Sequence, residues 1–388
     1  MGLSVMFNVS HSRSFSQEVK AMFRIVLVPE SKFEAKRFHY IILLDRSYSM
    51  EGAKLEMAKR GAELLMDNLP EDSYLSLISF NEKVSVIKEH VSSLSMEELD
   101  EAHEALSTIK PGSGTSLYKA LQEAFKISKR YRDPTYLILL TDGVPTDMGC
   151  VSRVSNKFRL EECLEVYEKL EVPEVVETIS FGIGDDYSPE ILSKISERGN
   201  GFFYHISDPS EIPEKMPKMV KSKVAAKNVV VDLVSESPVK LLNYEQLPVK
   251  INAVEGVVKI FGEATIPPNF SGKFMALKVK YQDEGGEQRK EIDFNLKVAK
   301  DQSEFLQGVD RDVIMEYQYM QTLKGYSEAL ESQNLVEATK RLDKLREIAE
   351  QTRRQDLMES TNEMTKKMNT GDVKGITSEI TRKMRSQE

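Results

Sequence analysis

Two short, uninterrupted apolar runs stand out in the pattern of hydrophobic and polar positions along the chain. The first, residues 40–44, ends at Asp45, and the second, residues 136–140, ends at Thr141 and Asp142. Runs of this length that are rich in Ile and Leu predict strands covered on both faces, as in a parallel sheet flanked by helices. After Gly52 the apolar residues recur at helical spacing, so the polar residues after the first run lie in a loop between a buried strand and a helix.

The same alternation of strand-like and helix-like patterns continues over residues 38–224. It predicts an α/β domain with a doubly wound, Rossmann-like and mainly parallel sheet. The connection at 81–83 is short enough for a hairpin, so the strand after it is expected at an antiparallel edge. The expected strands are 39–45, 73–80, 84–91, 135–141, 175–182 and 201–206, and the expected helices are 52–68, 96–108, 116–131, 157–170, 189–198 and 209–224.

The segments on either side of this domain have a period of two, which is typical of half-buried strands. Residues 225–300 contain several such runs separated by turn signals, which predicts an antiparallel β-sandwich. Residues 1–37 contain two strand-like runs that need a partner from elsewhere in the chain. They complete the sandwich most economically, and residues 38–224 are then an insertion into it.

The C-terminal region, residues 301–388, is predicted to be helical. Apolar positions at helical spacing indicate two helices up to about residue 357, with a break at 331–334, and therefore an α-helical hairpin. Beyond residue 358 the apolar periodicity is weak and Ser and Thr are frequent, so we expect a mobile tail.

Length, charge and cysteine content exclude several classes of function. A chain of 388 residues is expected to form two or three domains. The net charge of −9 disfavours direct binding to nucleic acid or to an anionic membrane. No apolar run is long enough to span a bilayer and no secretory signal is visible, which predicts a cytoplasmic protein. Cys150 and Cys163 are expected to be free thiols, with a disulfide as the alternative.

Oxygen-bearing side chains follow the two buried strands and one further loop. Asp45, Ser47 and Ser49 offer a carboxylate and two hydroxyls within one turn, and Thr115 lies at the end of a Gly- and Ser-rich loop before a helix. Asp142 follows the second buried strand. In open α/β sheets ligands bind at the carboxyl ends of strands, and converging oxygen atoms suit a hard cation such as Mg²⁺. The alternative is a helix-capping cluster with an ordinary Asp-Gly turn.

This pattern resembles the metal-ion-dependent adhesion site of von Willebrand factor type A (VWA) domains. The shared features are Asp-x-Ser-x-Ser after the first strand, a distant loop Thr, and Thr-Asp-Gly after the fourth strand. The resemblance implies Mg²⁺, or Mn²⁺ or Ca²⁺, held directly by Ser47, Ser49 and Thr115 and mainly through water by Asp45 and Asp142. It also implies that a partner's Asp or Glu completes the coordination.

Arg46 and Tyr48 fill the two variable positions of the first loop, where they are either surface residues or contacts for that partner. With the side chain of Asp45 expected in a solvent-facing loop, Asp45→Ala should leave the fold intact.

The overall layout is similar to that of prokaryotic VWA proteins and, among these, of the VWA proteins of the archaeal archaellum regulatory network. That resemblance implies a forkhead-associated (FHA) domain partner, phosphorylation by a Ser/Thr kinase with removal by a phosphatase, and repression of motility genes. The tail residues that could carry phosphate are Thr352, Ser360, Thr361, Thr365, Thr370, Thr377, Ser378 and Thr381.

Two other functions fit the same sequence. One is an adaptor for a MoxR-type AAA+ ATPase, and the other is a metal-dependent hydrolase. The five histidines are scattered outside the site loops, and the sequence has no nucleophile elbow, P-loop or Cys–His pair. A non-enzymatic interaction protein is therefore the predicted function.

Overall fold

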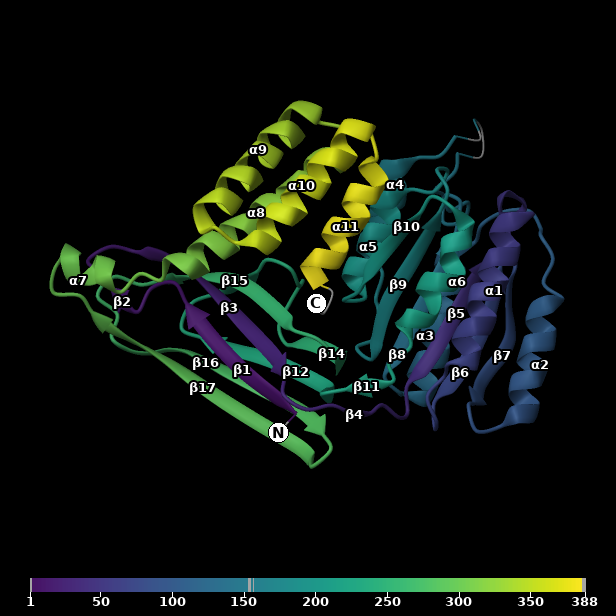
Figure 1. Ribbon diagram of the computed structural model, residues 1–388, viewed down its shortest axis with the longest axis horizontal. Coiled ribbons are helices and arrows are strands. Elements are labelled where there is room, and N and C mark those ends of the chain that lie inside the picture. Colours follow the sequence, from purple (N-terminus) through teal and green to yellow (C-terminus); the bar gives the residue numbers. More distant parts are fainter. Residues whose placement is uncertain (1, 153–154, 156, 386–388) are drawn as a thin grey trace. The chain divides into compact units, whose positions relative to one another are not determined.

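The computed structural model describes residues 2–152, 155 and 157–385 and divides into two compact units (Figure 1). Phe33–Val224 form one unit, here called the inserted unit, and Met1–Lys32 with Ala225–Glu388 form the other, here called the outer unit. The chain thus enters the outer unit, leaves it for the inserted unit and then returns. The fold class predicted from the sequence is confirmed.

The inserted unit is built on a six-stranded sheet in the order β10-β9-β8-β5-β6-β7. All neighbours are parallel except β7, which runs antiparallel to β6 at the edge. Every residue of the two central strands, β5 and β8, is buried, as their uninterrupted apolar runs predict. The strands are β5 (His39–Asp45), β6 (Tyr74–Phe80), β7 (Val84–Ser92), β8 (Thr135–Thr141), β9 (Val176–Ile183) and β10 (Phe202–Ile206).

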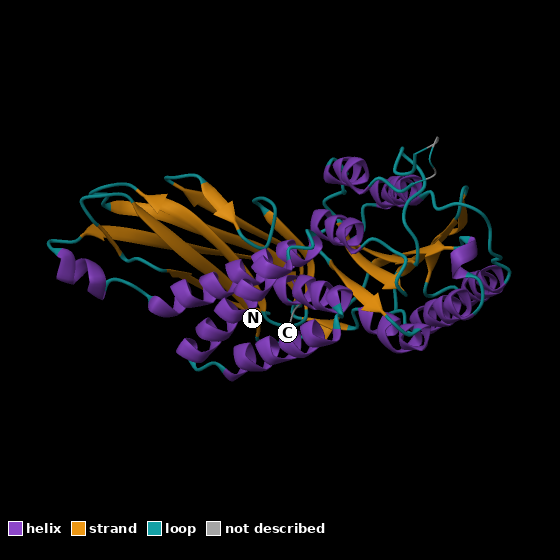
Figure 2. Ribbon diagram, turned by 90° about the horizontal axis from the view of Figure 1, so that it is seen from above, coloured by secondary structure: helices purple, strands orange, loops and turns teal. Residues whose placement is uncertain are grey.

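Helices cover both faces of this sheet (Figure 2). Side chains of α3 and α5 pack with alternate residues of β5 and β8, such as Ile41 and Leu139, in one core cluster. On the other side α1 packs beside the short helix α6 (Ile212–Lys215). The helices are α1 (Ala53–Asp67), α2 (Met96–Ser107), α3 (Leu117–Tyr131), α4 (Leu160–Glu168) and α5 (Pro189–Arg198), with a short 3-10 turn η1 (Tyr48–Met50) before α1.

The last helix expected in this unit, 209–224, is replaced by three short pieces. These are η2 (Pro209–Glu211), α6 (Ile212–Lys215) and η3 (Met216–Met219). Pro209, Pro213 and Pro217 recur through the segment, and each lacks the amide N–H that a continuous helix needs. The chain then forms β11 (Lys223–Val224), which pairs antiparallel with β4 (Phe33–Glu34), so the first and last strands of the inserted unit lie side by side.

The outer unit contains a β-sandwich. One sheet has the order β1-β3-β15-β13 and the other β14-β12-β16-β17-β2. The N-terminal strand β3 pairs with β1 on one side and with β15 on the other, so residues before the insertion are an integral part of the sandwich. The strands are β1 (Leu3–Val9), β2 (Arg13–Ser14), β3 (Val19–Pro29), β12 (Ala226–Ser235), β13 (Val239–Leu241), β14 (Val249–Val254), β15 (Val258–Ile266), β16 (Gly272–Asp283) and β17 (Gly286–Val298).

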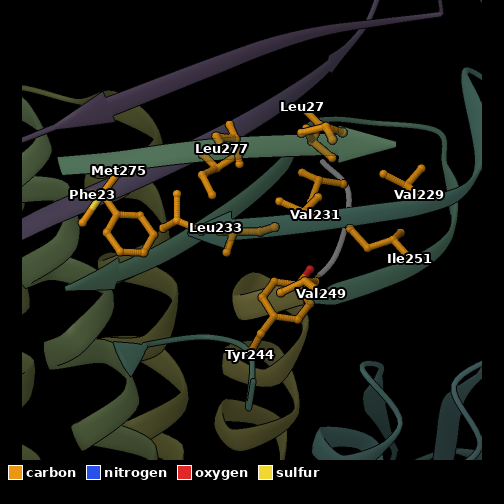
Figure 3. Close-up of a cluster of buried hydrophobic side chains, with 14 of the residues drawn as sticks. Phe23, Leu27, Val229, Val231, Leu233, Tyr244, Val249, Ile251, Met275 and Leu277 are labelled. Atoms are coloured by element: carbon orange, nitrogen blue, oxygen red, sulfur yellow. The ribbon is translucent and has the colours of Figure 1, made fainter. Parts of the chain in front are cut away.

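The core of the sandwich lies between these two sheets. Figure 3 shows Phe23 and Leu27 of β3 together with Val231 of β12 and Leu277 of β16, all of which belong to one buried cluster. These residues alternate with more exposed ones along their strands, which is the period of two seen in the sequence.

The C-terminal region contains the expected hairpin, formed by α8 (Arg311–Glu331) and α9 (Leu335–Thr352), and two further helices in place of a mobile tail. The short helix α7 (Gln302–Gln307) precedes the hairpin, and α10 (Gln355–Thr370) and α11 (Val373–Arg385) follow it. The expected break between the first two long helices is present at 332–334. The prediction of a mobile tail is wrong, because Met364 of α10 and Ile376 and Ile380 of α11 are buried in the core formed by α8 and α9.

Cys150 and Cys163 form a disulfide, with an S–S distance of 2.08 Å, so the expectation of free thiols is also wrong. The chain folds back on itself between them: the amide of Arg159 donates to the carbonyl of Cys150 at 2.8 Å, and α4 begins at the next residue. This return, which the spacing of the cysteines does not reveal, brings the first turn of α4 next to the loop after β8.

Candidate functional site

The turn after β5 is tied through its backbone to the loop that precedes α3. Ser47 and Gly112 form an isolated parallel bridge, and the amide of Gly112 donates to the carbonyl of Arg46 at 2.7 Å. Gly112 is needed here because a Cβ at this position would lie 2.1 Å from the side-chain amide of Asn81. Two of the three loops that carry the predicted site residues are therefore held together by main-chain contacts.

The hydroxyls of the first loop form a chain that leads to the acid after β8. The Ser47 and Ser49 hydroxyl oxygens are 3.0 Å apart, and the Ser49 hydroxyl donates to Oδ1 of Asp142 at 2.7 Å. Asp142 is fully buried, whereas Ser49 is exposed. The adjacent ends of two parallel strands thus bring together side chains that are far apart in the sequence.

Thr115 lies close to this group, in the loop that precedes α3. Its amide donates to the hydroxyl of Thr146 at 2.8 Å, and the amide of Thr146 donates back to the carbonyl of Thr115 at 2.9 Å. A Cβ built on Gly143 would meet the hydroxyl oxygens of Ser49 and Thr115, each at 3.7 Å. The missing side chain of Gly143 therefore leaves a small space that the Ser49 and Thr115 hydroxyls border.

Asp45 is buried beneath the site, and the expectation of a solvent-facing side chain is wrong. Its Oδ2 accepts from the hydroxyl of Thr141 at 2.6 Å and its Oδ1 from the amide of Ser47 at 2.8 Å. Burial raises the pKa of Asp45 to about 6, although both hydrogen bonds favour the ionised form. Asp45→Ala would leave these two donors without their acceptor, so it is not a neutral probe of the site.

A lysine that no motif indicates forms an ion pair with the buried Asp142. Nζ of Lys54, in the first turn of α1, donates to Oδ2 of Asp142 at 2.6 Å. The two carboxylate oxygens of Asp142 are thus divided between a hydroxyl and an ammonium group. Sequence reasoning also missed Thr141 and Thr146, whose roles depend on contacts between loops. The only signal for Lys54 was its place in a helix that begins directly after the site loop.

The two variable positions of the first loop differ in exposure. Tyr48 is 64% exposed, so its ring is available to a partner. Arg46 is half-buried, and its Nη1 donates to the carbonyl of Lys110 at 3.2 Å, which adds a further contact to the loop before α3.

The residues present fit a hard divalent cation better than a soft one. Within the described part of the chain, no group of three or more His, Cys, Asp or Glu side chains is placed to hold a metal ion. The donors that converge here are instead three hydroxyls and the carboxylate of Asp142, around the space left by Gly143. Oxygen atoms of this kind suit Mg²⁺.

The histidines lie away from this group and bond to other partners. His39 contacts the hydroxyl of Ser76 at 2.8 Å, and burial lowers its pKa to about 3. His90 contacts Asp133 at 3.0 Å. The other three, His11, His103 and His205, contact Ser10, Asp67 and Tyr187 respectively.

The candidate phosphorylation residues lie on α9, α10 and α11. The side chains of Ser360, Thr361, Thr377 and Ser378 are buried, so a kinase could reach them only if a helix opened. Thr370 is exposed at the end of α10, and Thr352, Thr365 and Thr381 are half-buried.

Comparison with known families agrees with this architecture. The family model of the von Willebrand factor type A domain matches residues 41–218. The larger part of the inserted unit therefore matches a VWA domain. The model described as "Archaellum regulatory network B, C-terminal domain" matches residues 311–386, which covers α8 to α11. The chain thus carries both domains, and the resemblance to archaellum regulatory network VWA proteins is confirmed.

Solved structures agree with this assignment. The crystal structure of the ArnB paralog VWA2 from Sulfolobus acidocaldarius is 28% identical, with a TM-score of 0.86, and the match covers 100% of this chain and 99% of that one. A von Willebrand factor type A protein from Catenulispora acidiphila is 16% identical, with a TM-score of 0.69 over 92% of this chain and 89% of that one, and shares the fold.

Curated relatives match about half of this chain. A VWA domain-containing protein of Dictyostelium discoideum is 25% identical over 186 residues, which are 48% of this chain and 18% of the relative. The inter-alpha-trypsin inhibitor heavy chain H2 of Homo sapiens is 22% identical over 186 residues, 46% of this chain and 19% of that protein. The chain therefore spans about a fifth of the length of these relatives. Among the helices of the described residues, none is long and apolar enough to cross a membrane.

Proposed function

We propose that the chain is a non-enzymatic regulatory protein that binds a protein partner through a divalent cation, Mg²⁺ first of all, held by Ser47, Ser49 and Thr115. The observation that carries the proposal is the convergence of three separate loops on one small space. Ser49 reaches Asp142 directly, and Thr115 and Ser49 border the same space beside Gly143. A partner that offers an Asp or Glu side chain fits such a site.

The chain's own residues orient this site before any partner arrives. Thr141 and the amide of Ser47 hold the carboxylate of Asp45, and Thr146 holds the backbone of Thr115. When bound, a cation with hydroxyl ligands supplies an electron-poor position that attracts an external carboxylate. The exposed Tyr48 and the neighbouring Arg46 are proposed as partner contacts at the rim of the site.

The regulatory part of the proposal is supported by the C-terminal domain match and by the similarity to the ArnB paralog VWA2. We infer a cytoplasmic protein whose partner has an FHA domain and which takes part in repression of archaeal motility genes. A Ser/Thr kinase adds phosphate to the helical C-terminal region and a phosphatase removes it. The exposed Thr370 is the most accessible of the candidates, because its side chain needs no helix to open.

Titration with Mg²⁺ and Mn²⁺ by calorimetry tests the metal site. Thr115→Val keeps the shape of the side chain and removes its hydroxyl, and we expect it to weaken metal binding at least tenfold. Ser113→Ala, in the same loop and with its hydroxyl directed to Glu82 at 3.4 Å, is the matched control and should bind as the wild type does. Equal affinity in Thr115→Val and wild type would contradict the assignment of Thr115.

Capture of partners from native lysate tests the regulatory role. An FHA-domain protein that is lost after phosphatase treatment supports the phosphorylation-dependent partnership. A partner that ignores phosphatase but is lost in EDTA and in Thr115→Val supports recognition through the metal site alone, and a MoxR-type ATPase in that fraction would indicate the adaptor function. Turnover of a phosphoester or peptide panel that Asp142→Ala abolishes would overturn the non-enzymatic assignment.

A further inference from the structure

A cavity of about 350 Å³ lies within the outer unit, and none of the candidate metal-site residues lines it. Its walls come from β15, from the loop between β13 and β14, and from helices α8, α10 and α11. Its volume is in the range of sites that bind small molecules. The site described above makes no use of it.

Positive charge is concentrated on the walls of this cavity. Lys259, Arg354, Lys383 and Arg385 line it, against the two acids Glu316 and Asp356. This local excess of positive charge occurs in a chain whose net charge is −9. The cavity therefore has the opposite charge to the chain as a whole, which favours an anionic ligand.

A buried carboxylate at the base of the cavity holds several of the cations in place. Glu316 is 5% exposed and accepts from Nζ of Lys259 at 2.7 Å, from Nη1 of Arg354 at 2.9 Å, and from the guanidinium of Arg24. Three cations thus meet this one carboxylate, whereas Lys383 is paired with the buried Glu379 at 3.5 Å. Arg354 also forms an ion pair with Asp356 through both of its other nitrogens.

The rest of the cavity wall is mainly apolar. Aromatic and aliphatic side chains line it, among them Tyr244, Phe261, Tyr319 and Leu357. The end of α11 is fixed against this wall, because the side-chain amide of Asn243 donates to the carbonyl of Met384 at 2.8 Å. A ligand that matches both parts carries a phosphate for the Arg and Lys groups and a flat ring for the aromatic wall.

We propose that this cavity binds a nucleoside monophosphate. Arg354, Lys259 and Lys383 recognise the phosphate, and the aromatic wall accepts the base. Because residues of α8, α10 and α11 all line the cavity, bound nucleotide fixes the C-terminal helices to the sandwich and stabilises the outer unit. The proposal is independent of the metal site, since it involves none of its residues.

Calorimetry and thermal unfolding of the full chain in EDTA, with AMP, GMP, CMP and UMP as probes, test the proposal. We expect at least one of the four nucleotides to bind and to raise the unfolding temperature. If AMP binds, adenosine and inorganic phosphate should each bind at least tenfold more weakly than AMP. Lys383→Gln should weaken binding at least tenfold, and Lys366→Gln, an exposed lysine of α10 outside the cavity, should not.

Hydrogen exchange provides a second measurement that does not depend on the variants. Bound nucleotide is expected to slow amide exchange in α11 and in the first turn of α10, and to leave β5 and β8 unchanged. If none of the four nucleotides binds, the proposal is overturned. It is also overturned if a folded Lys383→Gln binds as tightly as the wild type, or if inorganic phosphate binds as tightly as the best nucleotide.

Discussion

At the scale of single residues, Lys54 is the group with the clearest consequence for the proposed metal site. Its ammonium already neutralises the buried carboxylate of Asp142, at 2.6 Å from Oδ2. Two positive charges this close repel one another, so the lysine opposes a divalent cation at the neighbouring hydroxyls. We expect Lys54→Met to bind Mg²⁺ about tenfold more tightly than the wild type by calorimetry, since 1.4 kcal/mol of relieved repulsion corresponds to a factor of ten.

Lys126→Gln supplies the control for Lys54→Met, because it removes one positive charge from the exposed surface of α3 in the same unit. Its metal affinity should be unchanged. Without metal, Lys54→Met should unfold at a lower temperature than the wild type, because Asp142 is left buried without its cation. Weaker Mg²⁺ binding in Lys54→Met would show that the lysine supports the site and does not oppose the cation.

Glu316 predicts a dependence of stability on pH. Burial alone would raise its pKa, but Lys259, Arg354 and Arg24 outweigh burial and lower the pKa from 4.5 to about 2. Because the folded pKa lies below the unfolded one, the carboxylate stabilises the fold above pH 4.5, and that contribution is lost as the pH falls through about 2. The contribution at pH 7 is about 3 kcal/mol.

Urea unfolding of the outer unit at a series of pH values measures this contribution. Glu316→Gln should be about 3 kcal/mol less stable than the wild type at pH 7, and the gap should close between pH 4.5 and 2. Glu363→Gln, exposed on α10, serves as the control and should show no gap. A gap for Glu316→Gln that stays constant down to pH 2.5 would mean that packing and not charge stabilises this region.

The five proposed metal-site residues could be found from the sequence because each follows directly from a local signal. Asp45 and Asp142 end apolar runs, and parallel strands bring such ends to one edge of the sheet. Lys54 and Thr141 could not be assigned in this way, since their partners lie far away in the sequence, at Asp142 and Asp45. The prediction that the Asp45 side chain faces solvent was wrong for the same reason, because its partner Thr141 is 96 residues away in the sequence.

At the scale of elements, the disulfide connects the loop after β8 to α4. That loop includes Thr146, which holds the backbone of Thr115. The two cysteines are 13 residues apart, and closing a loop of this size stabilises a fold by about 3 kcal/mol. Replacing both Cys150 and Cys163 by Ser should therefore lower the free energy of unfolding of the inserted unit by about 3 kcal/mol in urea titrations.

Reduction of the wild-type protein is the matched comparison for this double variant. With dithiothreitol the wild type should unfold at the same urea concentration as the variant, and dithiothreitol should not change the variant. We also expect weaker Mg²⁺ binding in the reduced wild type and in the double variant, because the loop that holds Thr115 becomes less restrained. A double variant as stable as the oxidised wild type would show that the disulfide contributes nothing to this unit.

The helices α10 and α11 show where periodicity alone loses information about an element. Their inward side includes Thr361, Thr377 and Ser378, small polar residues that are buried with few large apolar neighbours in the sequence. The Tyr319 hydroxyl contacts that of Thr361 at 3.1 Å, so α8 supplies part of the polar interaction that such a side needs. A pattern built on large apolar residues therefore indicated a mobile tail, whereas α8 and α9 provide a surface on which these helices pack.

At the scale of the whole molecule, one chain builds two units because the insertion begins and ends at neighbouring strands. Phe33 of β4 faces Val224 of β11 across an antiparallel pair, where opposite Cα atoms lie about 5 Å apart. The outer unit needs both flanks of the insertion: β3 comes before it and pairs over its length with β15, which comes after it. The period-two pattern on both sides allowed this arrangement to be predicted from the sequence.

This arrangement predicts that the outer unit folds without the inserted one. Joining Lys32 to Ala225 by a short Gly-Ser linker requires no large displacement, because the two ends it replaces lie beside one another. The resulting protein should keep the sandwich and helices α8 to α11, with cooperative thermal unfolding by circular dichroism and protected amides in β3 and β15. Deleting residues 1–32 instead removes Phe23, Ile25 and Leu27 from the sandwich core and should abolish that protection. If the linked protein were unfolded while the deletion of 1–32 remained protected, the sandwich would depend on the insertion and not on its N-terminal strands.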